Sequence, residues 1–263
     1  MKFTREKYLD RIKYSGELKP NLSLLKKLQK NHILNIPFEN LDIHYQTPIE
    51  LNIDRIFEKI VQNNRGGFCY ELNGLFYELL LSLGFKAKRV SARVYEKGTK
   101  YSPEFDHFAI VVEIENIEYL TDVGFGEFIF EPLELQFGKI QKDPRGSYVV
   151  DKYEGEYFRI SKIEDGKSTP EYIFKNVECE LREYAERCRY HQSNPNSHFM
   201  KKRLISLPTE NGRITISGNT LKIKEETKVT EKELKNETDF EKELWEKFQI
   251  SLKKPVANNL YTK

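Results

Sequence analysis

Three residues of this sequence could form a nucleophilic cysteine site. Cys69 follows two glycines, His107 begins the apolar run HFAIVVEI, and Asp122 lies in the later run LTDVGF. A thiol reacts as its thiolate, an imidazole can take the thiol proton, and a carboxylate can fix the tautomer of that imidazole. These residue types therefore predict covalent catalysis through a cysteine, provided that the fold brings the three side chains together.

Cys69 is expected at the start of a helix. An apolar face follows it and stops at a glycine that ends helices well: Leu72, Leu75, Phe76, Leu79, Leu80, Leu83 and then Gly84. A helix N-terminus lowers the pKa of a thiol. Gly66 and Gly67 leave room around the sulfur and allow backbone amides to face it or a substrate carbonyl.

His107 and Asp122 are expected on neighbouring strands. If these strands pair as an antiparallel hairpin around Asn116, the two side chains come close together. Direct pairing of His107 with Asp122 puts the hairpin centre between Ile114 and Glu115, beside the turn. The carboxylate would then hold the imidazole and stabilise its charged form.

The residues alone leave several functions open. A cysteine on a helix is usually a small core side chain, but the glycine pair, the helix start and the His107–Asp122 hairpin together favour a nucleophile. Such a site suits a papain-like hydrolase, a transglutaminase-like crosslinker or an acyltransferase. A catalytically silent relative that binds a ligand or a partner is a further alternative, against which the complete set of three residues argues.

Composition narrows the class of protein. The chain has 263 residues, and 43 Lys and Arg against 41 Asp and Glu give a formal net charge of +2. This balance does not indicate binding to nucleic acid or to an anionic membrane. The mean hydropathy of −0.66, and the lack of a run of about 18 apolar residues, predict no membrane span. The start has no signal-peptide pattern, and three cysteines are too few for a disulfide framework, so we expect a cytoplasmic protein.

The surrounding pattern predicts an α+β fold. Two further helices are expected, one after an Asn21 cap and one over the apolar face that begins at Ile53. A mostly antiparallel sheet or small barrel follows, up to about Phe174, with strands in RVSARVY, HFAIVVEI, EYLTDVGF, GSYVVD and EYFRIS. GRITISGNTLKIKEE reads as a hairpin, and Thr230 with Glu233 forms a capping-box pattern before a last helix whose apolar face is Phe240, Leu244 and Phe248.

Several segments resemble one family. RGGFCYELNGLFYELLLSLGF, at residues 65–85, resembles the nucleophile motif of arylamine N-acetyltransferases. The same family shows segments similar to IPFEN, DHFAIVV and DVGFG, and less specific matches are PLEL, SNPNSHF and GRITISG. The resemblance covers nearly the whole chain in order and spacing.

The resemblance implies a fold and a reaction. The fold is an N-terminal helical bundle (1–85), a central antiparallel β-barrel (86–185) and a C-terminal α/β lid (186–263), with a catalytic core like that of cysteine proteases. The triad is Cys69, His107 and Asp122. Acetyl-CoA is the cosubstrate, no metal is needed, and the acetyl group passes by a ping-pong mechanism through an acetyl-cysteine to an arylamine, arylhydrazine or arylhydroxylamine. The implied role is xenobiotic metabolism, by a monomer or homodimer without nucleic-acid or membrane partners.

The resemblance also implies binding residues. The acceptor would contact Phe38, Asp106, Phe125 and Phe128, and CoA would contact Pro103, Gly124, Gly126 and Phe199. The segment SPEFD, before His107, differs from the small or hydroxylic residues of some relatives, which affects acceptor preference. Glu39 and Arg65 are expected to form a structural ion pair that braces the nucleophile loop. The four other histidines lack metal-ligand spacing and are expected to be surface or satisfied polar residues.

Overall fold

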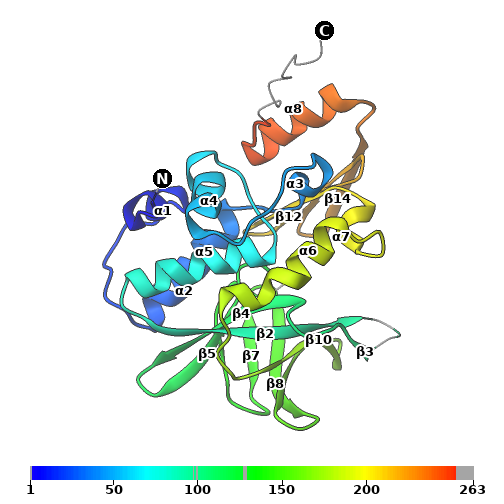
Figure 1. Ribbon diagram of the computed structural model, residues 1–263. Coiled ribbons are helices and arrows are strands. Elements are labelled where there is room, and N and C mark those ends of the chain that lie inside the picture. Colours follow the sequence, from blue (N-terminus) through cyan, green and yellow to red (C-terminus); the bar gives the residue numbers. More distant parts are fainter. Residues whose placement is uncertain (1, 97, 99, 127–128, 253–263) are drawn as a thin grey trace.

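The computed structural model describes residues 2–96, 98, 100–126 and 129–252 (Figure 1). The helices are α1 (Arg5–Arg11), α2 (Leu22–Asn35), α3 (Leu41–His44), α4 (Ile53–Phe57) continued by the π-turn η1 (Glu58–Gln62), α5 (Cys69–Ser82), the 3₁₀ turn η2 (Leu181–Tyr184), α6 (Ala185–Ser193), α7 (His198–Lys201) and α8 (Glu237–Phe248). The strands are β1 (Phe38–Glu39), β2 (Lys86–Glu96), β3 (Lys100–Tyr101), β4 (His107–Ile114), β5 (Ile117–Thr121), β6 (Leu133–Glu134), β7 (Ile140–Asp143), β8 (Gly146–Tyr153), β9 (Tyr157–Glu164), β10 (Lys167–Lys175), β11 (Leu204–Thr209), β12 (Gly212–Ser217), β13 (Thr220–Glu225) and β14 (Lys228–Glu233).

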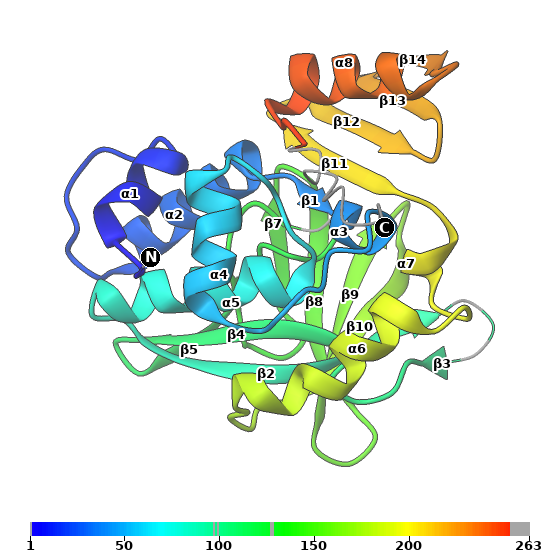
Figure 2. The same ribbon diagram turned by 45° about the horizontal axis from the view of Figure 1, so that its top comes forward.

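The predicted helices of the first third are confirmed. Asn21 caps α2 by accepting a hydrogen bond from the Leu24 N–H at 2.9 Å. α5 begins at Cys69, and Gly84, with a φ of +85°, follows its last turn. Because α5 is apolar on nearly all sides, it is buried at the centre of the helical layer, where it packs against β4 and β2 (Figure 2).

The predicted sheet is a nearly closed barrel. Its strands follow the antiparallel order β6-β5-β4-β2-β10-β9-β8-β7. The two end strands are joined by one side chain, because the Gln141 carboxamide accepts from the Glu134 N–H and donates to the Glu134 carbonyl, both at 2.8 Å. The interior holds an apolar core of Val90, Ala92, Ala109, Val111, Leu120, Ile129, Leu133, Tyr148, Val150, Ile160, Tyr172 and Phe174.

The β4–β5 hairpin is confirmed, with its centre one residue later than direct pairing of His107 with Asp122 requires. Glu115 and Asn116, both with positive φ, form the turn, and Ile114 pairs with Ile117. The ladder ends where Ile110 pairs with Thr121. Asp122 therefore leaves the sheet one residue beyond β5, with its backbone free to bend toward α5.

A second sheet, in the order β1-β11-β12-β13-β14, carries α8 on one face. The predicted β12–β13 hairpin is confirmed, since Ser217 pairs with Thr220 around the Gly218-Asn219 turn. The capping box at Thr230 and Glu233 is wrong: both residues lie in β14, which covers the open edge of β13. Asn236 caps α8 instead, by accepting from the Asp239 N–H at 2.9 Å.

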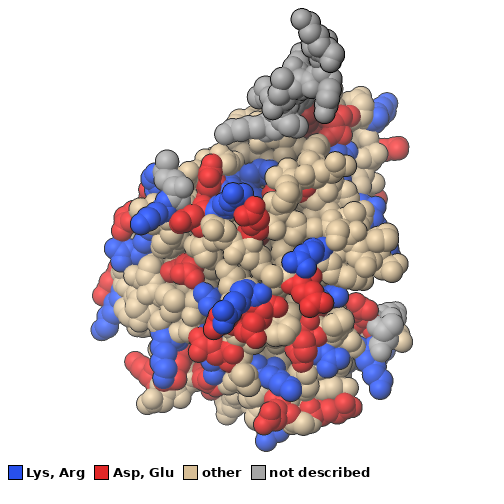
Figure 3. Space-filling model, viewed as in Figure 1, with Lys and Arg blue, Asp and Glu red and all other residues tan. Residues whose placement is uncertain are grey.

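Segments from different thirds of the sequence pack against one another. β1, from the helical first third, pairs with β11 of the last third, and Cys188 of α6 packs into the helical core. Figure 3 shows basic and acidic side chains interspersed over one face of the molecule, in line with the balanced charge. Within the described residues, no helix has both the length and the apolarity that a membrane span needs.

Candidate active site

Cys69 is the first residue of α5 and is only 4% exposed. Glu71 fixes the first turn, because its Oε2 accepts from the Phe68 N–H at 3.1 Å, while the Phe68 carbonyl accepts from the Leu72 N–H at 3.0 Å. The helix start is thus held by hydrogen bonds at both the N–H and the carbonyl of Phe68.

The electrostatic surroundings of Cys69 oppose a free thiolate. Burial raises the pKa of the Cys69 thiol well above its usual value, and the nearby carboxylates of Asp106 and Asp122 add to this effect. The N–H of Tyr70 at the helix start lowers the pKa, as expected, but it is outweighed. The thiol therefore needs a proton acceptor beside it in order to react.

His107 and Asp122 form a buried hydrogen-bonded pair. The His107 Nε2 lies 2.6 Å from Asp122 Oδ2, and both side chains are at most 2% exposed. Because Nε2 is occupied by the carboxylate, Nδ1 is the ring nitrogen that can exchange a proton with a thiol. The Tyr172 hydroxyl also donates to Asp122 Oδ2, at 3.1 Å.

Asp122 is tied to the same helix turn that carries Cys69. The Asn73 Nδ2, one turn after Cys69 on α5, donates to Asp122 Oδ1 at 2.8 Å, and the Asn73 Oδ1 accepts from the Val123 N–H at 2.8 Å. The Gly124 N–H donates to Asp122 Oδ1 at 2.9 Å. The loop after β5 is thus held against the first turns of α5, with Gly124 against the backbone of Cys69.

The glycines at the site allow neighbouring backbone segments to pack closely. A Cβ on Gly124 would lie 2.8 Å from the Cys69 Cα, and a Cβ on Gly66 would lie 2.0 Å from the Pro37 carbonyl oxygen. The Gly67 N–H donates to that same oxygen at 3.4 Å. Backbone packing therefore uses the Gly67 amide, whereas the amide that faces the Cys69 sulfur is that of Tyr70 at the helix start.

A small cavity of about 20 Å³ adjoins Asp122. It is lined by Ile33, Ile36, Phe38, Asp122, Val123, Gly124, Phe125, Gly126, Ile129, Ser206, Pro208 and Arg213. The Phe125 ring centroid lies 5.0 Å from the centroids of both His107 and Tyr172. The structure thus brings Phe38, Phe125 and both loop glycines around one cavity with room for about one water molecule.

The other predicted binding residues lie elsewhere. Pro103 is exposed in the turn before β4, and the Phe199 ring packs 5.9 Å from Phe38 and 6.0 Å from Phe68. The Asp106 carboxylate accepts hydrogen bonds from Arg187 and His191 and does not line the cavity beside Asp122. Phe128 lies outside the described residues.

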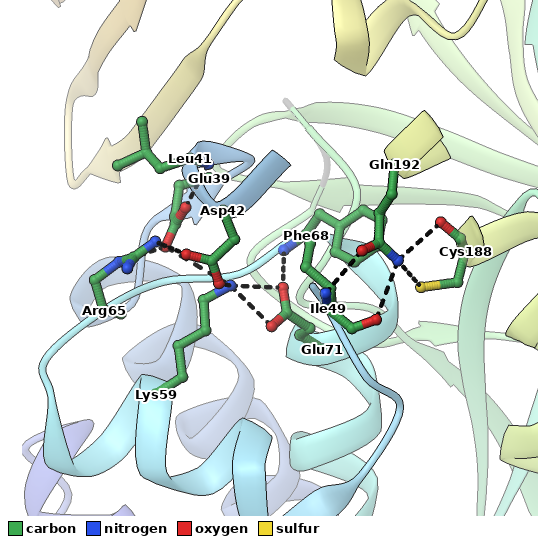
Figure 4. A network of polar contacts seen from close by, with 10 residues as sticks. All are labelled: Glu39, Leu41, Asp42, Ile49, Lys59, Arg65, Phe68, Glu71, Cys188 and Gln192. Atoms are coloured by element: carbon green, nitrogen blue, oxygen red, sulfur yellow. Dashed lines mark hydrogen bonds and ion pairs between the residues drawn. The ribbon is translucent and has the colours of Figure 1, made fainter. Parts of the chain in front are cut away.

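The predicted Glu39–Arg65 ion pair is confirmed, with a Glu39 Oε1 to Arg65 Nη2 distance of 2.8 Å. It belongs to a larger buried ionic cluster of Glu39, Asp42, Lys59, Arg65 and Glu71 (Figure 4). Burial lowers the pKa of Lys59, but the three carboxylates outweigh burial and raise it. The cluster braces the base of α5 through Glu71.

A larger hollow of about 1110 Å³ lies between α3, α4 and α8. Lys59, Arg65 and Glu71 line it together with Trp245, but Cys69, His107 and Asp122 do not. The small cavity therefore touches the predicted triad through Asp122, and the large hollow borders the ionic cluster.

The sequence analysis missed several residues that hold the predicted catalytic residues in place. Asn73 carried a usable signal, because it is a polar residue on an otherwise apolar helix face, one turn after the cysteine. Lys59, Tyr172 and Arg187 gave no such signal, since their partners lie far away in the sequence. His191 is buried and satisfied, with Ser197 at Nδ1 and Asp106 at Nε2. His32 is also buried, but only its Nδ1 is hydrogen-bonded, to Tyr8, and its Nε2 has no hydrogen-bond partner among the described residues, so the expectation of a satisfied residue is wrong there.

Known proteins are similar to this chain in both sequence and fold. A family model described as N-acetyltransferase matches residues 21–257. Arylamine N-acetyltransferase 1 of Homo sapiens is 31% identical over 277 residues, covering 96% of this chain and 96% of the relative. The pineal gland arylamine N-acetyltransferase isozyme NAT-3 of Gallus gallus is 30% identical, covering 95% and 94%.

Solved structures agree. The arylamine N-acetyltransferase of M. tuberculosis superimposes with a TM-score of 0.86 at 28% identity and covers 93% of each chain. That of Mycobacterium marinum in complex with CoA has a TM-score of 0.86 at 27% identity, covering 94% of this chain and 93% of the other. From the family match and the extent of these similarities, we conclude that the chain belongs to the arylamine N-acetyltransferase family.

Proposed function

We propose that this chain transfers the acetyl group of acetyl-CoA to arylamines, arylhydrazines or arylhydroxylamines through an acetyl-cysteine at Cys69. The observation that carries the proposal is the buried His107–Asp122 pair, which Asn73 and Gly124 link to the first turns of the Cys69 helix. The relative solved in complex with CoA supports CoA thioester as the donor.

In the first half-reaction, His107 Nδ1 takes the Cys69 proton, and the sulfur attacks the thioester carbonyl carbon. The new carbon–sulfur bond forms as the bond to the CoA sulfur breaks, and the departing CoA thiolate receives the proton from His107. Asp122 holds the ring and stabilises the imidazolium. Because the two leaving groups are thiolates of similar stability, the exchange needs little driving force.

In the second half-reaction, the amine nitrogen attacks the acetyl-cysteine. His107 takes a proton from that nitrogen, and Cys69 leaves as a thiolate that recovers the proton. An arylamine is a weak base and is unprotonated at neutral pH, whereas an aliphatic amine is mostly ammonium. The buried, aromatic surroundings of Cys69 keep water from the intermediate.

The binding residues follow from the cavity. We assign Phe38 and Phe125 to the acceptor, because an aromatic wall beside the His107 ring suits a planar amine. The cavity of about 20 Å³ must widen by side-chain movement before an arylamine enters. Gly126, Pro103 and Phe199 are assigned to CoA, Gly124 contributes its close approach to Cys69, and Phe128 remains an acceptor prediction outside the described residues.

The broader expectations remain part of the proposal. We infer a core related to that of cysteine proteases, divided near residues 85 and 185 into a helical bundle, a barrel and a lid, in a monomer or homodimer that needs no metal. The three free cysteines fit a reducing cytoplasm, and a role in xenobiotic metabolism follows from the aromatic acceptors.

Turnover of acetyl-CoA against a panel of arylamines, hydrazines and aliphatic amines tests this function. We expect aromatic acceptors to be used and aliphatic amines to be inactive, with all turnover lost in Cys69→Ala. Equal rates for both amine classes would contradict the aromatic pocket. Activity on peptide amides without acetyl transfer would favour the hydrolase or crosslinker reading.

A further inference from the structure

A second polar cluster adjoins the catalytic residues on the side of α6. Asp106, the residue before His107, accepts hydrogen bonds at Oδ1 from Arg187 Nε and His191 Nε2, both at 3.1 Å, and also from Arg187 Nη2. The Asp106 side chain is 7% exposed and that of Arg187 is 20% exposed. The pair is therefore largely removed from solvent, where charges interact more strongly than in water.

This cluster is coupled to the nucleophile by geometry. The Tyr70 hydroxyl donates to the backbone carbonyls of Phe105, at 2.7 Å, and Asp106, at 3.2 Å. Tyr70 directly follows Cys69, and Asp106 directly precedes His107. The segments that carry the nucleophile and the base are thus held together, with Asp106 between Tyr70 of the one and His107 of the other.

The charge of Asp106 affects the ionisation of the Cys69 thiol. The groups that raise the pKa of Cys69, after burial itself, are Asp106, Asp122 and the Cys188 thiol. Asp122 carries its charge as the partner of His107, so that charge serves the proposed chemistry directly. Burial raises the pKa of Asp106, but its hydrogen bonds and charge interactions with His191 and Arg187 outweigh burial, so Asp106 stays ionised. An uncompensated Asp106 charge would oppose a thiolate at Cys69.

We propose that Arg187 is a positioning residue that controls the thiolate population of Cys69 by cancelling the charge of Asp106. His191 completes the site, with its Nδ1 3.1 Å from the Ser197 hydroxyl, and His198 of α7 is the next titratable group on this side. The inference rests on Cys69 being the nucleophile of the proposed function. It replaces the predicted contact of Asp106 with substrate.

The test is the pH profile of Cys69 alkylation by iodoacetamide, followed by the mass of the Cys69 peptide. This readout separates Cys69 from Cys179 and Cys188 and needs no acetyl transfer, so it stays informative if the proposed function fails. The variants are Arg187→Met, Asp106→Asn and the double variant. Arg159→Met is the matched control, because Arg159 forms a similar ion pair with Asp151 on the barrel.

The two single variants are expected to shift the profile in opposite directions. Arg187→Met should move it by about one pH unit to higher pH, with alkylation at neutral pH about tenfold slower, and Asp106→Asn should move it to lower pH. The double variant should return to within about twofold of the wild-type rate, because both charges are then absent. Arg187→Lys, which keeps the charge, and Arg159→Met should leave the profile in place.

A purely structural role gives a different result. Shifts of both single variants in the same direction, or an unchanged profile in Arg187→Met, would overturn the inference. If Arg187→Met does not fold, Asp106→Asn decides alone, and a profile that fails to move to lower pH contradicts the proposal. Loss of acetyl transfer with the expected alkylation shifts would count against the proposed function and leave this inference standing.

Discussion

Two buried polar clusters flank the first turns of α5, and their charges are compensated in different ways. In the ionic cluster, Lys59 and Arg65 form direct ion pairs with three carboxylates. Around Asp122, four hydrogen-bond donors surround one carboxylate: the imidazole of His107, the amide of Asn73, the hydroxyl of Tyr172 and the N–H of Gly124. Direct ion pairs hold the carboxylates of the first cluster, whereas hydrogen-bond donors hold the Asp122 carboxylate, whose charge favours an imidazolium at His107.

The difference separates stability from reactivity. In the ionic cluster each carboxylate already has a direct cationic partner, so the cluster serves to hold the base of α5 in place. Hydrogen bonds keep the Asp122 carboxylate ionised, and its charge stabilises the imidazolium that forms at His107 when the thiol releases its proton. At the start of α5, the ionic cluster therefore contributes to stability, and the Asp122 cluster contributes to reactivity.

The largest expected effect comes from the Asp122 cluster. Asp122→Asn keeps the shape of the side chain but removes the charge that stabilises the imidazolium, and the corresponding change in a serine protease triad costs about 10⁴-fold. We expect a fall of about 10³- to 10⁴-fold in kcat/KM for acetyl transfer. Steady-state kinetics at several pH values measure it, with circular dichroism to verify folding. A loss under tenfold would remove Asp122 from the reacting unit.

The ionic cluster should respond mainly in stability. Lys59→Met leaves Glu71, Asp42 and Glu39 with too little positive charge, and breaking a buried ionic arrangement costs about 3–5 kcal/mol. We expect urea unfolding to show that decrease, with activity per folded molecule much less affected than in Asp122→Asn. Lys139→Met, which removes an exposed pair with Glu134, is the matched control and should cost under about 1 kcal/mol.

A smaller catalytic effect is expected at Asn73. Asn73→Ala removes one of the two donors to Asp122 Oδ1 and leaves the Val123 N–H without its partner, a cost of about 1–3 kcal/mol. If all of this cost appears in the transition state, kcat/KM falls by about 5- to 150-fold. Tyr172→Phe removes only one hydrogen bond to Asp122 and should cost about 2- to 10-fold. A larger loss in Tyr172→Phe than in Asn73→Ala would reverse the assigned order.

The smallest effect is a pH dependence in the ionic cluster. Burial raises the pKa of Asp42, but Lys59 and Arg65 outweigh it and lower the pKa below its usual 3.8. A lowered folded-state pKa adds stability above the unfolded pKa, and this stability is lost as the pH falls through the folded pKa. The stability advantage of the wild type over Asp42→Asn should therefore shrink from about pH 7 to about pH 3. Urea unfolding at both pH values measures it, and a constant difference would contradict the sign.

Much of the fold followed from local pattern. Asn21 and the apolar spacing after it marked α2, and Glu115-Asn116 marked the turn of the β4–β5 hairpin, because helix caps and tight turns depend on nearby residues. The capping box at Thr230 failed for the opposite reason. Its segment is a strand because β13 offers an open edge, and that edge exists only once the second sheet has formed.

The candidate site was predictable to a similar extent. The sequence pattern and the family resemblance predicted Cys69, His107 and Asp122 as catalytic residues, and in the structure His107 is hydrogen-bonded to Asp122. The partners Lys59, Tyr172 and Arg187 were not identified. Arg187, on α6, is 81 residues from Asp106 in the sequence, and Tyr172, on β10, is 50 residues from Asp122. No local pattern predicts contacts between residues so far apart in the sequence.

The most direct test of the central claim is the mass of the Cys69 peptide after the protein is mixed with acetyl-CoA in the absence of acceptor. Cys69 should carry one acetyl group, which an arylamine then removes with release of the acetylated amine, and Cys69→Ser should show no thioester adduct. Turnover of acetyl-CoA with an arylamine while Cys69 stays unmodified, or an adduct on Cys179 or Cys188 instead, would contradict the account.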